Sequence, residues 1–192
     1  MTLAANPPVT IVSGLPRSGT SLMMQLLVTG GLEPVTDGQR PPDESNPRGY
    51  FEYEPVKSLA RDQSWLASAR GKVVKIIVQL LPFLPAELPV RIILMQRDLD
   101  EVLASQAKML HKSIPPAQQQ VLKETFQKHW EQARQTFTAR PGSSLLVVNH
   151  RELLSAPEPV IERLAGFLEP GNLQRQAMLA AIDPTLYRNR VP

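Results

Sequence analysis

Near its N-terminus the chain passes from an apolar strand through a glycine-framed loop into an apolar helix, and this transition constrains the fold most. Residues 9–13 form an apolar run rich in β-branched side chains that ends at Gly14. Gly19 follows, and residues 19–29 repeat apolar side chains with helical spacing. The spacing of the two glycines is that of a phosphate-binding P-loop, in which backbone N–H groups and a helix N-terminus hold anionic oxygens. The segment therefore predicts a strand–loop–helix unit with an anion site at its turn.

The loop departs from the common P-loop at one chemically important position. Thr20 stands where the usual lysine would be, and Arg17 supplies a cation inside the loop instead. Backbone N–H groups of residues 17–21 could still surround an anion. The missing lysine argues against an ordinary ATPase and favours a phosphate-like group that is handled by arginine.

Further along the chain, short apolar runs alternate with segments of helical pattern. In addition to residues 9–13, we expect strands at residues 33–36, 72–78, 90–95 and 145–149. Helices are expected at residues 19–29, 55–69, 98–111, 117–138, 151–155 and 157–168, with a short one after residue 173. Such alternation is typical of a parallel sheet with right-handed crossovers. The pattern predicts one domain over residues 1–192, an α/β three-layer sandwich.

Composition narrows the classes of protein to which the chain can belong. Its 192 residues suffice for one packed domain, and the absence of cysteine excludes disulfides, thiolate metal sites and cysteine nucleophiles. The net charge of +3 arises from basic residues interspersed with acidic ones, which disfavours a nucleic-acid surface. No leader is recognisable, and no apolar run approaches the ~18 residues of a membrane helix. We therefore expect a cytoplasmic protein without a membrane or nucleic-acid partner.

Residues at the carboxyl ends of the strands are the first candidates for function, because open parallel sheets bind ligands beyond those ends. Arg97 directly follows the apolar strand at residues 90–95, after Gln96, and Ser105 lies eight residues further on. A guanidinium fork and a hydroxyl donor together suit a phosphate. The sequence therefore predicts a second anion site beside the loop at residues 14–21.

These two motifs, in this order, resemble the sulfotransferase superfamily. Residues 14–21 (Gly-Leu-Pro-Arg-Ser-Gly-Thr-Ser) are similar to its 5′-phosphosulfate loop, in a form common among bacterial and tyrosylprotein members. Residues 97–105 are similar to its 3′-phosphate motif, in which an arginine is followed by a serine. Residues 46–52 and 187–190 also resemble segments of small bacterial sulfotransferase-like proteins.

The resemblance implies a P-loop fold with the kinase-like strand order and helices on both faces of a five-stranded parallel sheet. It implies 3′-phosphoadenosine 5′-phosphosulfate as co-substrate and transfer of its sulfuryl group to a hydroxyl or amine. Sulfuryl transfer needs no bridging magnesium ion, so no metal is expected, and a cationic side chain must stabilise the bridging oxygen as charge develops there. The donor-binding residues that the resemblance implies are Arg17, Ser18, Gly19, Thr20 and Ser21 at the 5′ end, and Arg97 and Ser105 at the 3′-phosphate.

The residue that takes the acceptor's proton has several candidates. Members of the family with this form of loop often use a glutamate near the second strand. Asp43, Glu44 and Glu52 lie in that region, and we favour Glu52. Among the histidines, His150 is placed at the carboxyl end of a strand, whereas the other two are expected at the surface.

Three further basic residues are candidates for the site. Lys75 lies within an apolar strand, where lysine is rare unless paired, so it either reaches the carboxyl-end site or caps an edge. Arg17, Glu52 and Lys75 are thus the candidate catalytic residues. Arg188 and Arg190 either close over the donor or belong to a frayed basic tail.

The acceptor is expected to be a small molecule, a glycan or a peptide, chosen by loops at residues 37–54, 80–89 and 111–120. A homodimer could supply the missing walls of an acceptor pocket. Two alternative functions stay open. A P-loop kinase-like phosphotransferase would require a lysine in place of Thr20 and a magnesium-holding acid after a strand. A catalytically silent protein of the same fold would bind the nucleotide and transfer nothing.

Overall fold

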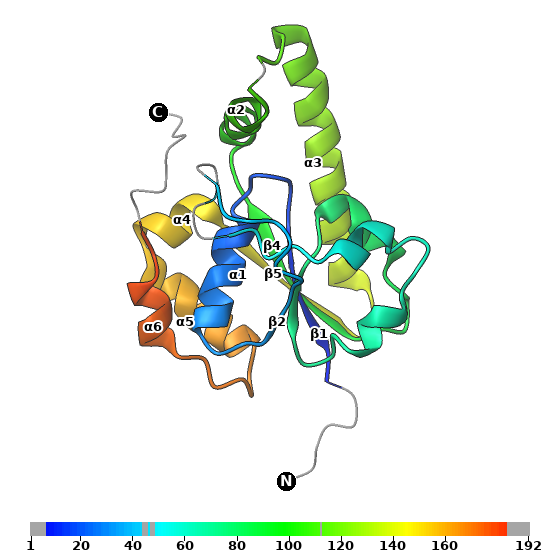
Figure 1. The fold of residues 1–192 in the computed structure, drawn as a ribbon, viewed down its shortest axis with the longest axis vertical. Helices are drawn as coiled ribbons and strands as arrows, with labels where there is room; N and C mark the ends of the chain where they lie inside the picture. The colour runs from blue at the N-terminus through cyan, green and yellow to red at the C-terminus, as the bar shows by residue number, and fades with distance from the viewer. Residues whose placement is uncertain (1–6, 44–45, 47–48, 112, 184–192) are drawn as a thin grey trace.

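A parallel β-sheet of five strands forms the centre of the molecule (Figure 1). The computed structural model describes residues 7–43, 46, 49–111 and 113–183. The strand order is β2-β3-β1-β4-β5, and every pairing between these strands is parallel. The fold class is therefore confirmed as α/β with the kinase-like order. The strands are β1 (Val9–Ser13), β2 (Pro34–Val35), β3 (Val73–Lys75), β4 (Val90–Gln96) and β5 (Ser143–Asn149).

Helices cover both faces of this sheet. In Figure 1, α1, α4, α5 and α6 lie on one side of the strands, and α3 lies with residues 54–67 and 78–83 on the other. The helices are α1 (Thr20–Thr29), α2 (Leu99–Leu110), α3 (Pro116–Ala139), α4 (His150–Ser155), α5 (Pro157–Phe167) and α6 (Arg175–Ala180). Three short 3₁₀ helices complete the described part: η1 (Glu54–Ser58), η2 (Ser64–Ala67) and η3 (Val78–Phe83). No helix in the described ranges is both long enough and apolar enough to cross a bilayer.

Alternate residues of the central strands build two separate cores. Ile92 and Leu94 pack with Trp130 and Phe137 of α3, whereas Ile93 packs on the opposite face among residues of α1 and α5. Successive side chains of a strand point to opposite faces, so an uninterrupted apolar run such as β4 fits only a sheet that is covered on both sides. Both tryptophans, Trp65 and Trp130, are buried in the core that contains Ile92.

Two predicted elements differ from the structure. The α-helix expected at residues 55–69 is wrong, because this segment forms η1 and η2 with a turn between them. The turn is fixed by Asp62, whose side chain accepts the backbone N–H of Ser64 at 2.9 Å. The strand expected at residues 72–78 is shorter than predicted and ends at Lys75. Its backbone nevertheless continues beside β1, since Val78 N–H donates to the Gly14 carbonyl at 3.0 Å.

Candidate functional site

The loop at residues 14–21 connects β1 to α1 at the carboxyl edge of the sheet. Gly19 precedes α1 with a left-handed φ of 97°, a conformation that glycine adopts without strain. A Cβ atom on Gly19 would come within 2.5 Å of Cδ2 of His150, the first residue of α4. Both the backbone angle and the close neighbour therefore require glycine at this position.

Ser18 and Thr20 flank Gly19 and are both buried. The Ser18 hydroxyl has no hydrogen-bond partner within the described residues, although the side chain is only 1% exposed. A buried hydroxyl without a partner costs about 1–3 kcal/mol, which a ligand oxygen could relieve. This hydroxyl is therefore suited to bind an anionic ligand held by the loop.

Arg17 occupies the turn of the same loop with a φ of 70°, which is unusual for a residue other than glycine. Its Nε donates to the Ser105 hydroxyl of α2 at 3.0 Å, and one of its terminal nitrogens lies 3.8 Å from the sulfur of Met109. Burial lowers the pKa of Arg17, and the neighbouring charge of Arg97 lowers it further. The guanidinium is thus held in a partly desolvated place where its attraction for an anion is stronger than in water.

Arg97 and Ser105, the predicted second anion site, both contact Arg17. Arg97 donates from Nη1 to the Arg17 carbonyl at 3.0 Å and from Nε to Glu101 at 2.9 Å. The two predicted anion sites are consequently adjacent at the edge of the sheet. Arg17 therefore links Arg97 to Ser105, because its carbonyl accepts from Arg97 and its Nε donates to Ser105.

Lys75 and Glu52, two of the candidate catalytic residues, lie side by side. Lys75 at the end of β3 reaches the carboxyl-end site, where Nζ is 3.7 Å from a Glu52 oxygen and donates to the Tyr50 carbonyl. The same carbonyl accepts the Ser21 hydroxyl at 3.4 Å, so the P-loop and β3 meet at this backbone group. Burial lowers the pKa of Lys75 to about 8.

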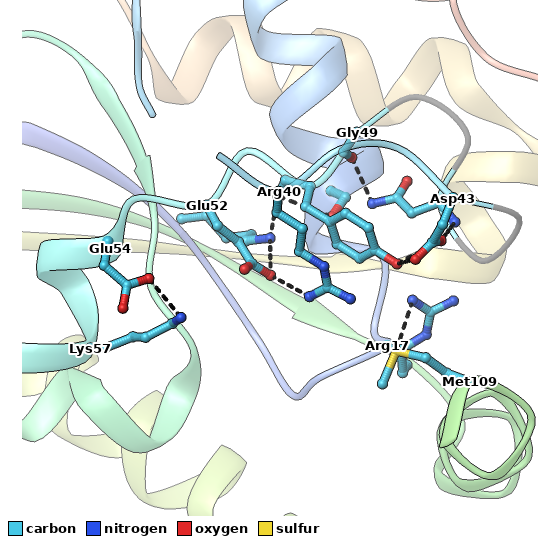
Figure 2. A network of polar contacts seen from close by, with 12 residues as sticks. Arg17, Arg40, Asp43, Gly49, Glu52, Glu54, Lys57 and Met109 are labelled. Carbon is cyan, nitrogen blue, oxygen red and sulfur yellow. Dashed lines mark hydrogen bonds and ion pairs between the residues drawn. The ribbon is translucent and has the colours of Figure 1, made fainter. Parts of the chain in front are cut away.

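Arg40 is a member of the site that the sequence analysis did not identify. Its Nη1 donates to Glu52 at 2.9 Å, and its guanidinium carbon lies 3.4 Å from the centre of the Tyr50 ring. The Tyr50 hydroxyl in turn donates to the Asp43 carboxylate at 2.6 and 2.7 Å. Figure 2 shows Arg40, Asp43 and Glu52 gathered on one segment that faces the loop carrying Arg17. The proline-rich sequence around Arg40 held no spacing that could have revealed this role.

Among the histidines, His150 lies beside the loop at Gly19, but its imidazole is a poor proton acceptor. Burial lowers the pKa of His150 to about 3, so its imidazole is neutral at physiological pH and only weakly basic. His111 is exposed and ends α2, and His129 lies on α3. Three further candidates lie outside the described residues, namely Glu44, Arg188 and Arg190.

Fold and site together define an α/β protein in which several cations surround a P-loop-like turn, an arrangement suited to an anionic ligand. No protein-family model matches the chain, and no curated protein matches it. Among solved structures, the chain is similar to an unliganded sugar kinase from Janibacter sp. HTCC2649, at 15% identity over 94% of this chain and 98% of that one, with a TM-score of 0.46. A similarity at this level does not distinguish one function from another.

Proposed function

We propose that this chain is a transferase that moves the sulfuryl group of 3′-phosphoadenosine 5′-phosphosulfate to a hydroxyl or amine of an acceptor. The observation that carries the proposal is the position of Arg17. Its guanidinium contacts Ser105 and its carbonyl contacts Arg97, so the two motifs that resemble phosphate sites adjoin one another. A nucleotide with phosphates at both ends of its ribose has the chemistry to occupy both.

In this proposal the loop binds the 5′ end of the donor, and Arg97 with Ser105 binds its 3′-phosphate. An acceptor oxygen or nitrogen attacks the sulfur atom, and the bond between sulfur and the bridging phosphate oxygen breaks. The leaving group is adenosine 3′,5′-bisphosphate, and negative charge grows on its former bridging oxygen. Arg17 and the ammonium form of Lys75 are the cations assigned to stabilise that charge.

Glu52 is assigned as the group that takes the acceptor's proton. Its carboxylate lies 3.7 Å from the Lys75 ammonium, which supports a base and a cation acting on the same reaction. The ion pair with Arg40 must open for Glu52 to reach the acceptor. The acceptor remains a small molecule, a glycan or a peptide in this proposal.

A kinase-like phosphotransferase is the second candidate, because the strand order β2-β3-β1-β4-β5 fits it equally well. Thr20 stands in the place of the phosphate-binding lysine, and β4 is followed by Arg97 rather than by a metal-binding acid at that position. These two positions favour the sulfuryl donor over a magnesium nucleotide. A protein that binds the donor product without transferring anything differs from the proposal only in activity.

Thermal unfolding with two nucleotides tests the proposal. Adenosine 3′,5′-bisphosphate at about 100 times its Kd should raise the Tm by roughly 5–10 °C, while ATP with Mg²⁺ should leave it unchanged. Arg17→Ala should abolish the shift, and Arg61→Ala, which alters an exposed arginine, should retain it. A shift with ATP and Mg²⁺ alone would instead support the phosphotransferase. Labelled sulfate transfer to a panel of acceptors then separates an enzyme from a silent binder.

A further inference from the structure

Glu101 is a buried carboxylate that the proposed transfer does not use. It lies in the first turns of α2 and is 1% exposed, and among the described residues it is the only aspartate, glutamate, lysine or arginine that is buried. A carboxylate loses its hydration on burial, and this loss is tolerated when cations replace the water. The neighbours of Glu101 should therefore explain how its burial is tolerated.

Two arginines bind Glu101 from different elements. Arg97 at the end of β4 donates from Nε to one carboxylate oxygen at 2.9 Å, and its side chain is 9% exposed. Arg151 of α4 reaches the other oxygen at 3.4 Å and is 58% exposed. The shorter and better buried contact is the one to Arg97, so Glu101 mainly fixes the direction of that guanidinium.

The fixed guanidinium of Arg97 acts on the loop. From this position its Nη1 donates to the carbonyl of Arg17 at 3.0 Å. One turn beyond Glu101 on the same face of α2, Ser105 accepts the Nε of Arg17 at 3.0 Å. Arg17 is consequently held at both its main chain and its side chain, in a left-handed conformation that an arginine disfavours on its own.

We propose that Glu101 is a positioning residue that, through Arg97, fixes the left-handed turn at Arg17 and so couples the two anion-binding segments. The contacts themselves do not depend on a ligand, but the consequence for donor binding rests on the proposed function. Loss of the charge on Glu101 should release Arg97 from its anchor, and the turn at Arg17 should loosen as a result.

Hydrogen exchange of the full chain without nucleotide tests the positioning directly. Amides of residues 14–21, including Ser18 N–H, which donates to the Leu15 carbonyl, should exchange about tenfold faster in Glu101→Gln than in the unaltered protein. Asp100→Asn is the matched control, because it makes the same chemical change at the preceding residue, which is exposed and pairs with Lys123. Unchanged exchange of residues 14–21 in Glu101→Gln would overturn the inference.

A double variant tests whether faster exchange in Glu101→Gln arises only from a destabilised fold. Arg97→Gln combined with Glu101→Gln removes both charges of this ion pair, so the fold should be retained while the loop still exchanges about tenfold faster. If the double variant restores slow exchange of the loop, the ion pair is only a structural charge balance and the inference fails.

Nucleotide binding separates this inference from the proposed function. Glu101→Gln should weaken the binding of adenosine 3′,5′-bisphosphate about tenfold. It should also weaken the binding of adenosine 5′-phosphosulfate, which has no 3′-phosphate, because the effect reaches Arg17. If only the binding of the bisphosphate weakens, Glu101 acts on the 3′-phosphate site alone, and the proposed coupling of the two anion-binding segments is refuted. If the unaltered protein binds neither nucleotide while the loop loosens as expected, the positioning role stands and the proposed function fails.

Discussion

Lys75 is a residue whose surroundings disfavour its charged form. Burial lowers its pKa from the ordinary 10.5 to about 8, and the carboxylate of Glu52 opposes that shift only in part. At neutral pH most of the side chain still carries its proton, so it can stabilise negative charge. It can also release the proton in a pH range where ordinary lysines cannot.

Lys75 should therefore give the stability of the protein a distinctive dependence on pH. Between pH 8 and 10.5 the unfolded chain holds a proton on this amine that the folded chain has lost, so the free energy of unfolding rises with pH across that window. Relative to Lys75→Met, the unaltered protein should gain about 3 kcal/mol over the window. Urea unfolding at a series of pH values measures this, with Lys128→Met on the exposed part of α3 as control. Parallel stability curves for the protein and Lys75→Met would refute the shift.

Among the secondary-structure elements, those with strong local signals were predictable. The run at residues 90–95 and the pattern at residues 117–138 correspond to β4 and α3 within a residue or two. The segment at residues 55–69 was not. Val56, Leu59 and Leu66 would share one face of an α-helix, but the turn at Asp62 divides the segment and the buried Trp65 lies off that face. Tertiary packing onto the sheet, rather than local propensity, decides the structure of that segment.

The junction between the P-loop and α1 should be intolerant of even a methyl group. Gly19→Ala places a Cβ 2.5 Å from His150 and also strains a backbone φ of 97°, so we expect a loss of roughly 2–5 kcal/mol in unfolding free energy. Gly38→Ala is the matched control, because its φ is 66° and nothing lies within 4 Å of the added Cβ. That variant should lose only about 1–2 kcal/mol. Equal losses in denaturant unfolding would show that the contact with His150 is unimportant.

In the molecule as a whole, the site combines segments that are distant in the sequence, and this limits what a sequence can predict. The P-loop and the residues after β4 could be placed at one edge, because the carboxyl ends of parallel strands meet there. The bond from Arg17 to Ser105 joins residues 88 apart, and Arg40 reaches Glu52 from within an irregular loop. Such contacts depend on loop conformation and side-chain rotamers, for which periodicity and spacing carry no signal.

The proposed function predicts how a nucleotide bound at both sites should protect the molecule. A ligand held at both anion sites contacts the loop at residues 14–21 and the start of α2 together, so adenosine 3′,5′-bisphosphate should slow hydrogen exchange about tenfold in both segments. Exchange in α6, which packs on α5 away from the carboxyl edge, should stay within about twofold of the free protein and serves as the internal reference. Arg97→Gln should remove the protection of α2. Part of the protection of residues 14–21 should remain, because backbone N–H groups of that loop still bind the 5′ end of the nucleotide. Protection confined to a single segment would mean that the nucleotide is held at one end only, and the role of Arg97 as its 3′-phosphate ligand would then be wrong.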